Sequence, residues 1–190
     1  MPRFEWHILD NSGQRKYVAA PEMMRFIDVA KRLPEPQALF CLFLAATGCR
    51  VSEAAFLMRS NVHPGRATVR TLKRRKLVYR ELQLPFFLSA RLMALPPCPA
   101  QPERVWNIHR ATGWRWVKRA MRQSGISGTP ACPKGLRHGF GIRAASARTP
   151  AGLIQRWLGH ASPDTTAIYL DAVDDEERAF ASRCWPMIDI

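Results

Sequence analysis

The feature that most constrains the fold of this chain is an almost wholly apolar run, residues 38–47 (ALFCLFLAAT), between Pro36 and Gly48. A helix that is hydrophobic on every side must be enclosed by other elements. Glycine ends helices readily because it adopts the left-handed conformation at little cost. The run therefore predicts a central buried helix that ends at Gly48, with the rest of the chain packed around it.

Helical signals recur on both sides of this run. Pro21 suits the first position of a helix, and apolar residues then recur at helical spacing up to Leu33. Later segments open on proline or on a residue that caps helices, as Ser162 does. Further helices are expected over residues 51–58 and 112–124, from 133 onward, from 149 to 159, and from 162 through Tyr169.

Two short β-like runs, residues 68–72 and 77–84, flank the basic segment Lys73-Arg74-Arg75-Lys76. They predict a hairpin with a basic tip, although the turn lacks an Asn-Gly type signal. The expected fold class is therefore mainly α with a small antiparallel β-sheet or hairpin. A chain of 190 residues is long enough for one domain with a single core.

The charge of the chain points to a polyanionic partner. The formal net charge is +14, and acidic residues gather from Asp171 onward, so the part before them is more basic still. A field of this size attracts nucleic acid, although a generic basic protein would share it. Because the basic residues cluster at expected helix starts and in the hairpin, nucleic acid is the favoured partner.

Cysteine usage and hydropathy indicate a reduced, aqueous compartment. The five cysteines are odd in number and form no C-x-x-C pair, so neither a disulfide framework nor a metal site is expected. No apolar run approaches the roughly 18 residues that a membrane helix needs, and the N-terminus has no signal-peptide layout. We expect no membrane association and a cytoplasmic, nucleoid-associated location.

The helix expected over residues 112–124 separates two kinds of side chain. One face carries Trp114, Val117 and Met121, and the other is basic, with Arg115, Lys118, Arg119 and Arg122. Such a basic face is typical of a DNA-contacting helix, and it is equally typical of a solvated surface. Both interpretations stay open from the sequence.

The run from Lys134 to Tyr169 carries residue types suited to phosphodiester transfer. That reaction needs a nucleophile, cations on the nonbridging oxygens, a proton acceptor for the nucleophile and a donor for the leaving oxygen. Tyrosine is a poor nucleophile at neutral pH because its phenol has a pKa near ~10. Cationic and proton-accepting neighbours would activate Tyr169 toward phosphorus, and arginine suits the nonbridging oxygens because its planar fork pairs with phosphate.

Three segments together resemble the motifs of the tyrosine recombinase, or phage integrase, family: AATGCRVSEAAFL (45–57), PKGLRHGF (133–140) and RWLGHASPDTTAIY (156–169). The resemblance extends over roughly residues 17–173. It implies the catalytic-domain fold of that family, with residues 1–16 as an N-terminal extension and 174–190 as a C-terminal tail.

The resemblance also implies a role for each matching residue. Arg50 and Arg137 would hold the nonbridging oxygens of the scissile phosphate, and Glu53 would support Arg50. His160 would hydrogen-bond that phosphate, and Tyr169 would attack it. In the basic hairpin, Lys73 best matches the family's lysine that donates to the leaving 5′ oxygen, and Lys76 is the second candidate.

The PKGLRHGF segment departs from the family pattern, because Lys134 stands where histidine is usual. Lysine has a pKa near ~10.4 and accepts a proton poorly. Either its pKa is lowered by neighbouring arginines, or Lys134 only stabilises charge. His138 is a secondary candidate, since on a helix it points about 100° away from Arg137.

The implied activity is site-specific recombination of double-stranded DNA through a 3′-phosphotyrosyl intermediate, with no metal, ATP or other cofactor. A homotetramer on two DNA sites would act through a Holliday junction, and the apolar tail 180–190 would dock in trans on a neighbour or fold back in cis. The N-terminal DNA-clamping domain of most relatives has no counterpart here, which suggests a short recombinase, an accessory protein or a fragment.

Two other activities fit the same residues. A type IB topoisomerase would use the same nucleophile but relax supercoils without site preference. A regulator that retained the recombinase fold would bind DNA without cleaving it, as Lys134 and the lack of a clamping domain would allow. The substitution Tyr169→Phe separates these classes, because only an enzyme loses its function.

Overall fold

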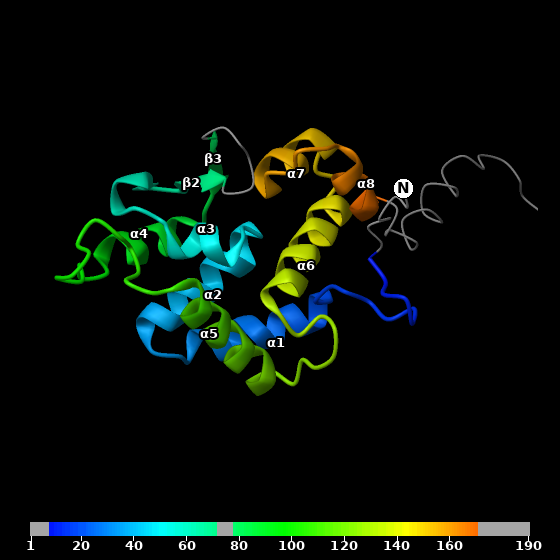
Figure 1. The fold of residues 1–190 in the computed structure, drawn as a ribbon, viewed down its shortest axis with the longest axis horizontal. Coiled ribbons are helices and arrows are strands. Elements are labelled where there is room, and N and C mark those ends of the chain that lie inside the picture. The colour runs from blue at the N-terminus through cyan, green and yellow to red at the C-terminus, as the bar shows by residue number, and fades with distance from the viewer. Residues whose placement is uncertain (1–7, 72–77, 171–190) are drawn as a thin grey trace, which may run out of the picture.

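The structure, a computed structural model, describes residues 8–71 and 78–170 (Figure 1). The helices in these ranges are α1 (Ala20–Lys31), α2 (Glu35–Thr47), α3 (Val51–Ala55), α4 (Phe86–Ala94), α5 (Arg110–Gln123), α6 (Pro133–Ser146), α7 (Ala151–Leu158) and α8 (Asp164–Leu170), with a 3-10 turn at Arg59–Asn61. Strands β1 (Val62–His63), β2 (Arg66–Thr71) and β3 (Val78–Gln83) form one antiparallel sheet in that order. The expected fold class is confirmed.

Helix α2 is the central helix, as its apolar sequence predicts. It packs against α1, α4, α5 and α6, and its Leu39, Phe40 and Phe43 side chains are fully buried. The ring of Phe40 meets Trp106 edge-on, with the centroids 5.1 Å apart. The helix ends at Gly48 with a φ of 61°. Glycine is also required there by space, because a Cβ atom would lie 2.7 Å from the ring of Phe140.

Helix α3 is shorter than the expected 51–58, since it ends at Ala55. The residues that follow pair with a distant segment instead of continuing the helix. Arg59 donates its backbone N–H to the carbonyl of Glu103, and Val105 donates to Leu57. Because this pairing partner lies far along the chain, the local helical pattern could not reveal it.

The β2–β3 hairpin is confirmed, with Arg66 paired to Gln83 at one end and Thr71 to Val78 at the other. The expected runs, 68–72 and 77–84, overlap both strands but place their ends differently, and β1 was not expected. The basic tip with Lys73 and Lys76 lies outside the described residues.

Helices α6, α7 and α8 form a second, smaller hydrophobic cluster that includes Ile154, Leu158 and Tyr169. Glycine ends α7, as expected, with Gly159 at a φ of 65°. This cluster packs beside α2, and Arg137 of α6 contacts both the turn after α2 and the turn after α7.

Helix α5 corrects one expectation. Val117 and Met121 are buried as predicted, but Trp114 is 46% exposed as a residue and its ring lies beside Lys118. The buried stripe instead starts at Gly113, which faces Phe40, and Trp114 is turned about 100° from it. No helix in the described ranges is long and apolar enough to cross a membrane.

Candidate active site

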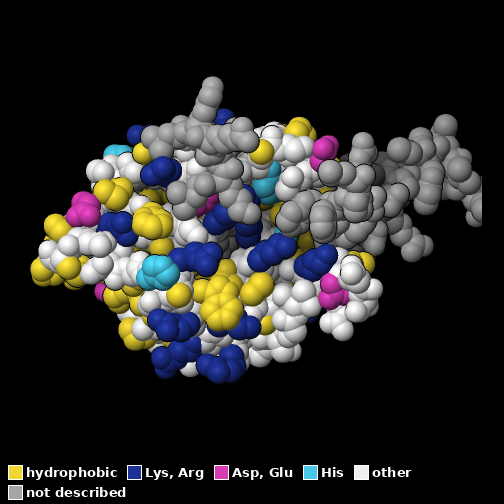
Figure 2. All heavy atoms as spheres, in the orientation of Figure 1, with side chains coloured by type: hydrophobic (Ala, Val, Ile, Leu, Met, Phe, Trp, Pro, Cys, Tyr) yellow, Lys and Arg dark blue, Asp and Glu magenta, His cyan; other side chains and the backbone are white. Residues whose placement is uncertain are grey.

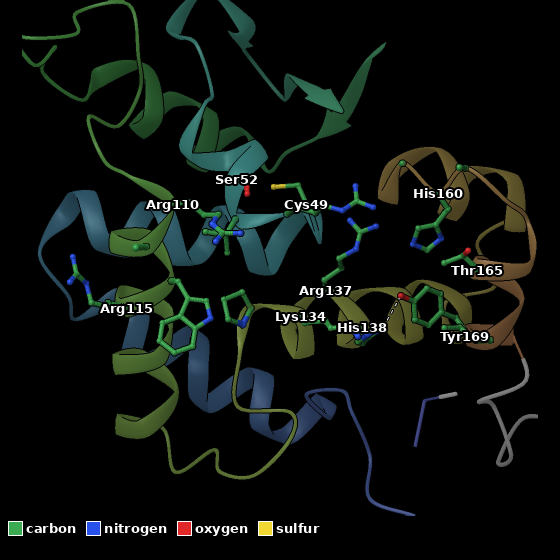
Figure 3. Close-up of a pocket in the computed structure, with 18 residues that line it drawn as sticks. Cys49, Ser52, Arg110, Arg115, Lys134, Arg137, His138, His160, Thr165 and Tyr169 are labelled. Carbon is green, nitrogen blue, oxygen red and sulfur yellow. Dashed lines mark hydrogen bonds between the residues drawn. The ribbon is translucent and has the colours of Figure 1, made fainter. Parts of the chain in front are cut away.

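A pocket of about 850 Å³ lies between the start of α3, the first turns of α5 and α6, and helix α8 (Figure 3). The structure brings most of the predicted site residues together in it. Its lining includes Arg50, Lys134, Arg137, His138, His160 and Tyr169. It also includes Arg110, Trp114 and Arg115 of α5, which are not in the family motifs quoted above. Lys73 and Lys76 are not among the described residues.

Arg50 stands immediately before α3 and is held by Glu53. The Glu53 carboxylate accepts the backbone N–H of Arg50 at 2.8 Å and its Nη1 at 2.9 Å. The side chain of Arg50 keeps 24% of its surface exposed at the pocket, whereas that of Glu53 is fully buried. The buried carboxylate therefore orients Arg50 and leaves its guanidinium accessible at the pocket. This is the supporting role expected of Glu53.

Arg80 of β3 is a second partner of Glu53 that the sequence did not single out. Its Nη2 lies 2.6 Å from Glu53 Oε2, its Nη1 2.8 Å from Thr71 Oγ1, and its Nε 2.8 Å from the Trp157 carbonyl. Burial by itself would raise the pKa of Glu53, but Arg80 and Arg50 bring it below the usual value. In the sequence, the only sign of this role was an arginine at a position that falls on the buried face of strand β3.

Arg137 is almost fully buried and reaches two turns of the main chain. Its Nη1 donates to the Gly48 carbonyl at 3.0 Å and its Nη2 to the Leu158 carbonyl at 2.7 Å. Burial, and then the charge of Arg50, lower its pKa to about 10, so it remains a cation at neutral pH. No carboxylate forms an ion pair with it within the described ranges.

His160 follows Gly159 and lies over the nucleophile candidate. Its Nδ1 is 2.8 Å from Thr166 Oγ1, and its ring stacks on that of Tyr169 with the centroids 6.0 Å apart. Burial, and then Arg137 and Arg50, lower its pKa to about 3. The imidazole is therefore neutral at pH 7, and its one ring N–H can donate a hydrogen bond to a bound anion.

Tyr169 is only 1% exposed as a residue, yet it lines the pocket. Its ring packs on Gly141 of α6 so closely that a Cβ atom there would lie 2.7 Å away. Burial raises the pKa of the phenol, while the charges of Arg137 and Arg50 oppose that rise. Tyr169 is therefore a neutral phenol here, placed where cations favour its phenolate.

His138, the secondary candidate, contacts the Tyr169 hydroxyl directly. Its Nδ1 lies 2.9 Å from Tyr169 Oη (Figure 3). Lys134, four residues earlier, is at the exposed start of α6 and also lines the pocket. The 100° offset of His138 from Arg137 directs it toward α8, which the spacing along α6 alone did not reveal.

No group of three or more His, Cys, Asp or Glu side chains among the described residues is placed to hold a metal ion. The pocket instead gathers cations around a phenol, and the side chains of Lys and Arg also gather on the surrounding face (Figure 2). Chemically, this arrangement can hold a phosphate beside a hydroxyl nucleophile.

The fold resembles that of tyrosine recombinase catalytic domains, and the pocket brings together residues that such a domain is expected to use. Residues 100–176 match the model of the phage integrase family. Two recombinases are similar over most of the chain: XerA from Pyrococcus furiosus, 30% identical over 81% of this chain and 56% of its own length, and XerC from Nitrobacter winogradskyi, 32% identical over 80% and 53%. The matched segment and these relatives support a tyrosine recombinase catalytic domain, and the chain spans just over half the length of the two relatives.

Solved structures show the same fold. A crystal structure of XerA recombinase superimposes with a TM-score of 0.73 at 24% identity, over 90% of this chain and 65% of the other. XerH recombinase bound to a difH substrate gives 0.71 at 21% identity, over 87% and 52%. The catalytic domain of bacteriophage HP1 integrase gives 0.66 at 20% identity and is matched over 95% of its length.

Proposed function

We propose that this chain is a site-specific recombinase that cleaves and rejoins double-stranded DNA through a 3′-phosphotyrosyl intermediate. The observation that carries the proposal is that Tyr169, Arg50, Arg137 and His160, drawn from segments far apart in the chain, line one pocket. A buried phenol beside two guanidinium groups is arranged for attack on a phosphate that those groups hold.

In the proposed reaction, the scissile phosphate enters the pocket and Arg50 and Arg137 bind its nonbridging oxygens. Tyr169 Oη attacks phosphorus, a P–O bond to tyrosine forms, and the bond to the 5′ oxygen breaks. That oxygen takes a proton from the hairpin, for which Lys73 is the first candidate and Lys76 the second. The 5′ hydroxyl of a partner strand then attacks the phosphotyrosine and releases Tyr169.

The bond energy stays in the phosphotyrosyl link, so the proposed cycle consumes no ATP. The two guanidinium groups supply the charge that a metal ion provides in other phosphoryl-transfer sites. Lys134 lies at the mouth of the same pocket and contributes positive charge.

Double-stranded DNA is the proposed partner. The pocket lining continues from the catalytic cluster to Arg110 and Arg115 of α5, which extends positive charge beyond a single phosphate. The similar XerH structure holds its difH substrate, and the XerA and XerC relatives are named recombinases. By the same resemblance we propose a homotetramer on two DNA sites, an accessory protein or further domain for clamping DNA, and a place on the nucleoid.

Covalent trapping in the source cell tests the proposed function. Tagged chain is recovered under denaturing conditions and the attached DNA is sequenced, with Tyr169→Phe as the matched control. We expect DNA linked to the wild-type chain and none to the variant, because only a hydroxyl at position 169 can form the ester. The recovered sequences would identify the recombination site.

Absence of linked DNA in the wild type would contradict cleavage in that cell and favour a regulator that binds DNA without cutting it. A Holliday-junction substrate in vitro then separates such a regulator from a recombinase that lacks its accessory protein, since only the latter resolves the junction. Linked DNA without any shared sequence, together with supercoil relaxation, would instead indicate a topoisomerase.

A further inference from the structure

The contact between His138 and Tyr169 has no part in the reaction described above. The two side chains lie on different helices, α6 and α8, and their Nδ1 and Oη atoms are 2.9 Å apart (Figure 3). His138 is only 6% exposed as a residue and lines the pocket beside the phenol. A buried imidazole in contact with the reacting atom of a nucleophile is the usual arrangement of a general base.

From this geometry we propose that His138 accepts the proton of Tyr169 during strand cleavage. This role rests on the proposed function of the site. It assigns to His138 the proton transfer that Lys134 would otherwise have to perform.

The direction of the hydrogen bond follows from counting unsatisfied groups. The Nε2 atom of His138 is buried and has no hydrogen-bond partner among the described residues. If Tyr169 donates to Nδ1, one donor, the Nε2–H, is left without a partner. If Nδ1–H donates to Tyr169, both the bare Nε2 and the phenolic O–H are left, and each buried unsatisfied group costs free energy. The phenol is therefore the donor and Nδ1 the acceptor.

The surroundings keep His138 neutral before DNA binds. Lys134 and Arg137 of α6 and Lys16 of the N-terminal segment are the cations that act on it, and Tyr169 of α8 faces it. Burial, and then these charges, lower its pKa to about 4, so the ring is neutral at pH 7 and Nδ1 keeps the lone pair that accepts from Tyr169. The negative charge of a bound phosphate opposes the effect of the cations, so substrate binding makes the imidazole more basic when the proton must move.

Lys134 is less suited to the same step. An ammonium group has no lone pair until it loses a proton, whereas a neutral imidazole already has one. Lys134 is also exposed at the start of α6, and the hydroxyl of Tyr169 meets His138 instead. A lysine at position 134 is thus compatible with catalysis if it stabilises charge while His138 handles the proton.

The step balances as a single transfer. As Tyr169 Oη bonds to phosphorus, its proton passes to His138 Nδ1, which becomes an imidazolium. The P–O5′ bond breaks, and the 5′ oxygen takes a proton from the separate hairpin donor. When a partner strand's 5′ hydroxyl attacks the phosphotyrosine, the proton of that hydroxyl returns to the hairpin donor, and Tyr169 leaves and takes its own proton back from His138.

The test separates proton acceptance from positioning. His138→Asn keeps an acceptor oxygen near the place of Nδ1 but cannot take a proton. His63→Asn, at the exposed position of strand β1, is the matched control. The probe is a nicked duplex that carries the DNA site recovered by covalent trapping. A second version has sulfur in place of the 5′ bridging oxygen, because a thiolate leaves without needing a proton.

We expect His138→Asn to lower the single-turnover rate of covalent-complex formation by about 100-fold on both duplexes, within the range for loss of a general base. Lys73→Ala should form the covalent complex slowly on the oxygen duplex and at close to the wild-type rate on the sulfur duplex. His63→Asn should match the wild type. For His138→Ala, added imidazole should restore cleavage, because the space left by the side chain opens on the pocket. If His138 were only structural, added imidazole would have no effect.

His138→Asn cleaving either duplex at the wild-type rate would overturn this inference and leave the proposed function intact. A different result would assign proton acceptance to Lys134. In that case Lys134→Met would cleave neither the oxygen nor the sulfur duplex, while His138→Asn would remain active. A wild-type chain that neither forms a covalent complex in the cell nor resolves a Holliday junction in vitro would overturn the proposed function and this inference together.

Discussion

Among single residues, Arg137 best shows how the fold holds a charge ready for a ligand. Two of its N–H groups donate to main-chain carbonyls at Gly48 and Leu158, which are the ends of two helices. Burying a cation without a counter-ion costs free energy. No carboxylate pairs with Arg137 in the described ranges, so a bound phosphate would supply the missing negative charge.

This position yields a prediction for the proposed reaction. Arg137→Ala should lower covalent cleavage of the recovered DNA site by at least about 100-fold, because the charge that develops on phosphorus loses a buried donor. DNA affinity should change far less, since the other basic residues of the face remain. Single-turnover cleavage and fluorescence anisotropy measure the two effects separately.

Arg143→Ala is the matched control. Arg143 lies on the same helix and also donates to a main-chain carbonyl, that of Ala45, but it does not line the pocket. The Arg143→Ala variant should therefore cleave DNA at the wild-type rate. Cleavage that survives in Arg137→Ala would show that the scissile phosphate binds elsewhere.

At the scale of secondary-structure elements, Glu53 and Arg80 join three parts of the fold. Glu53 belongs to α3, Arg80 to β3, and the Arg80 Nε atom reaches the Trp157 carbonyl in α7. The guanidinium also packs on Gly159, where a Cβ atom would lie 3.0 Å from it. The sheet that leads to the basic hairpin is therefore attached directly to the residues that position Arg50 and His160.

Removal of one member of this buried pair should be costly. Arg80→Met leaves the Glu53 carboxylate without its main partner, and we expect the free energy of unfolding to fall by roughly 3–5 kcal/mol. Arg91→Met, which removes an exposed pair with Glu35, should cost no more than about 1 kcal/mol. Urea titration measures both, and equal losses would contradict the structural role assigned to Arg80.

At the scale of the whole molecule, Lys and Arg side chains gather on the face shown in Figure 2. Arg115 and Arg119 are exposed on α5, and Arg115 lines the pocket. Trp114, exposed among them, belongs to this surface and not to the core. The basic face of α5 is therefore continuous with the site, which favours DNA contact over a merely solvated surface.

This continuity predicts how DNA affinity depends on salt. Each phosphate neutralised by the protein steepens the fall of affinity with salt by nearly one unit of slope. Arg115→Gln with Arg119→Gln should reduce the slope by roughly 2. Arg66→Gln with Arg91→Gln, in β2 and α4 and not among the residues that line the pocket, should leave the slope unchanged. Anisotropy titrations over a range of salt measure the slopes, and equal slopes would remove α5 from the interface.

Local chemistry accounts for what the sequence predicted correctly. The apolar run of α2, the glycines at 48 and 159 and the prolines at 21 and 133 act through their own backbone and burial preferences, which need no distant partner. The resemblance of short motifs nominated Arg50, Arg137, His160 and Tyr169, and these four residues line one pocket. These features together were enough to predict the fold class and the family of the catalytic domain.

The tertiary structure decided which side chains meet across helices. The end of α3 depends on pairing with residues 103–105, and Arg80 reaches Glu53 from a strand that follows it by many residues. The contact between His138 and Tyr169 requires α8 to pack on α6 beside Gly141. A sequence pattern specifies spacing along one element, whereas these contacts depend on how separate elements pack, so only the folded chain could assign them.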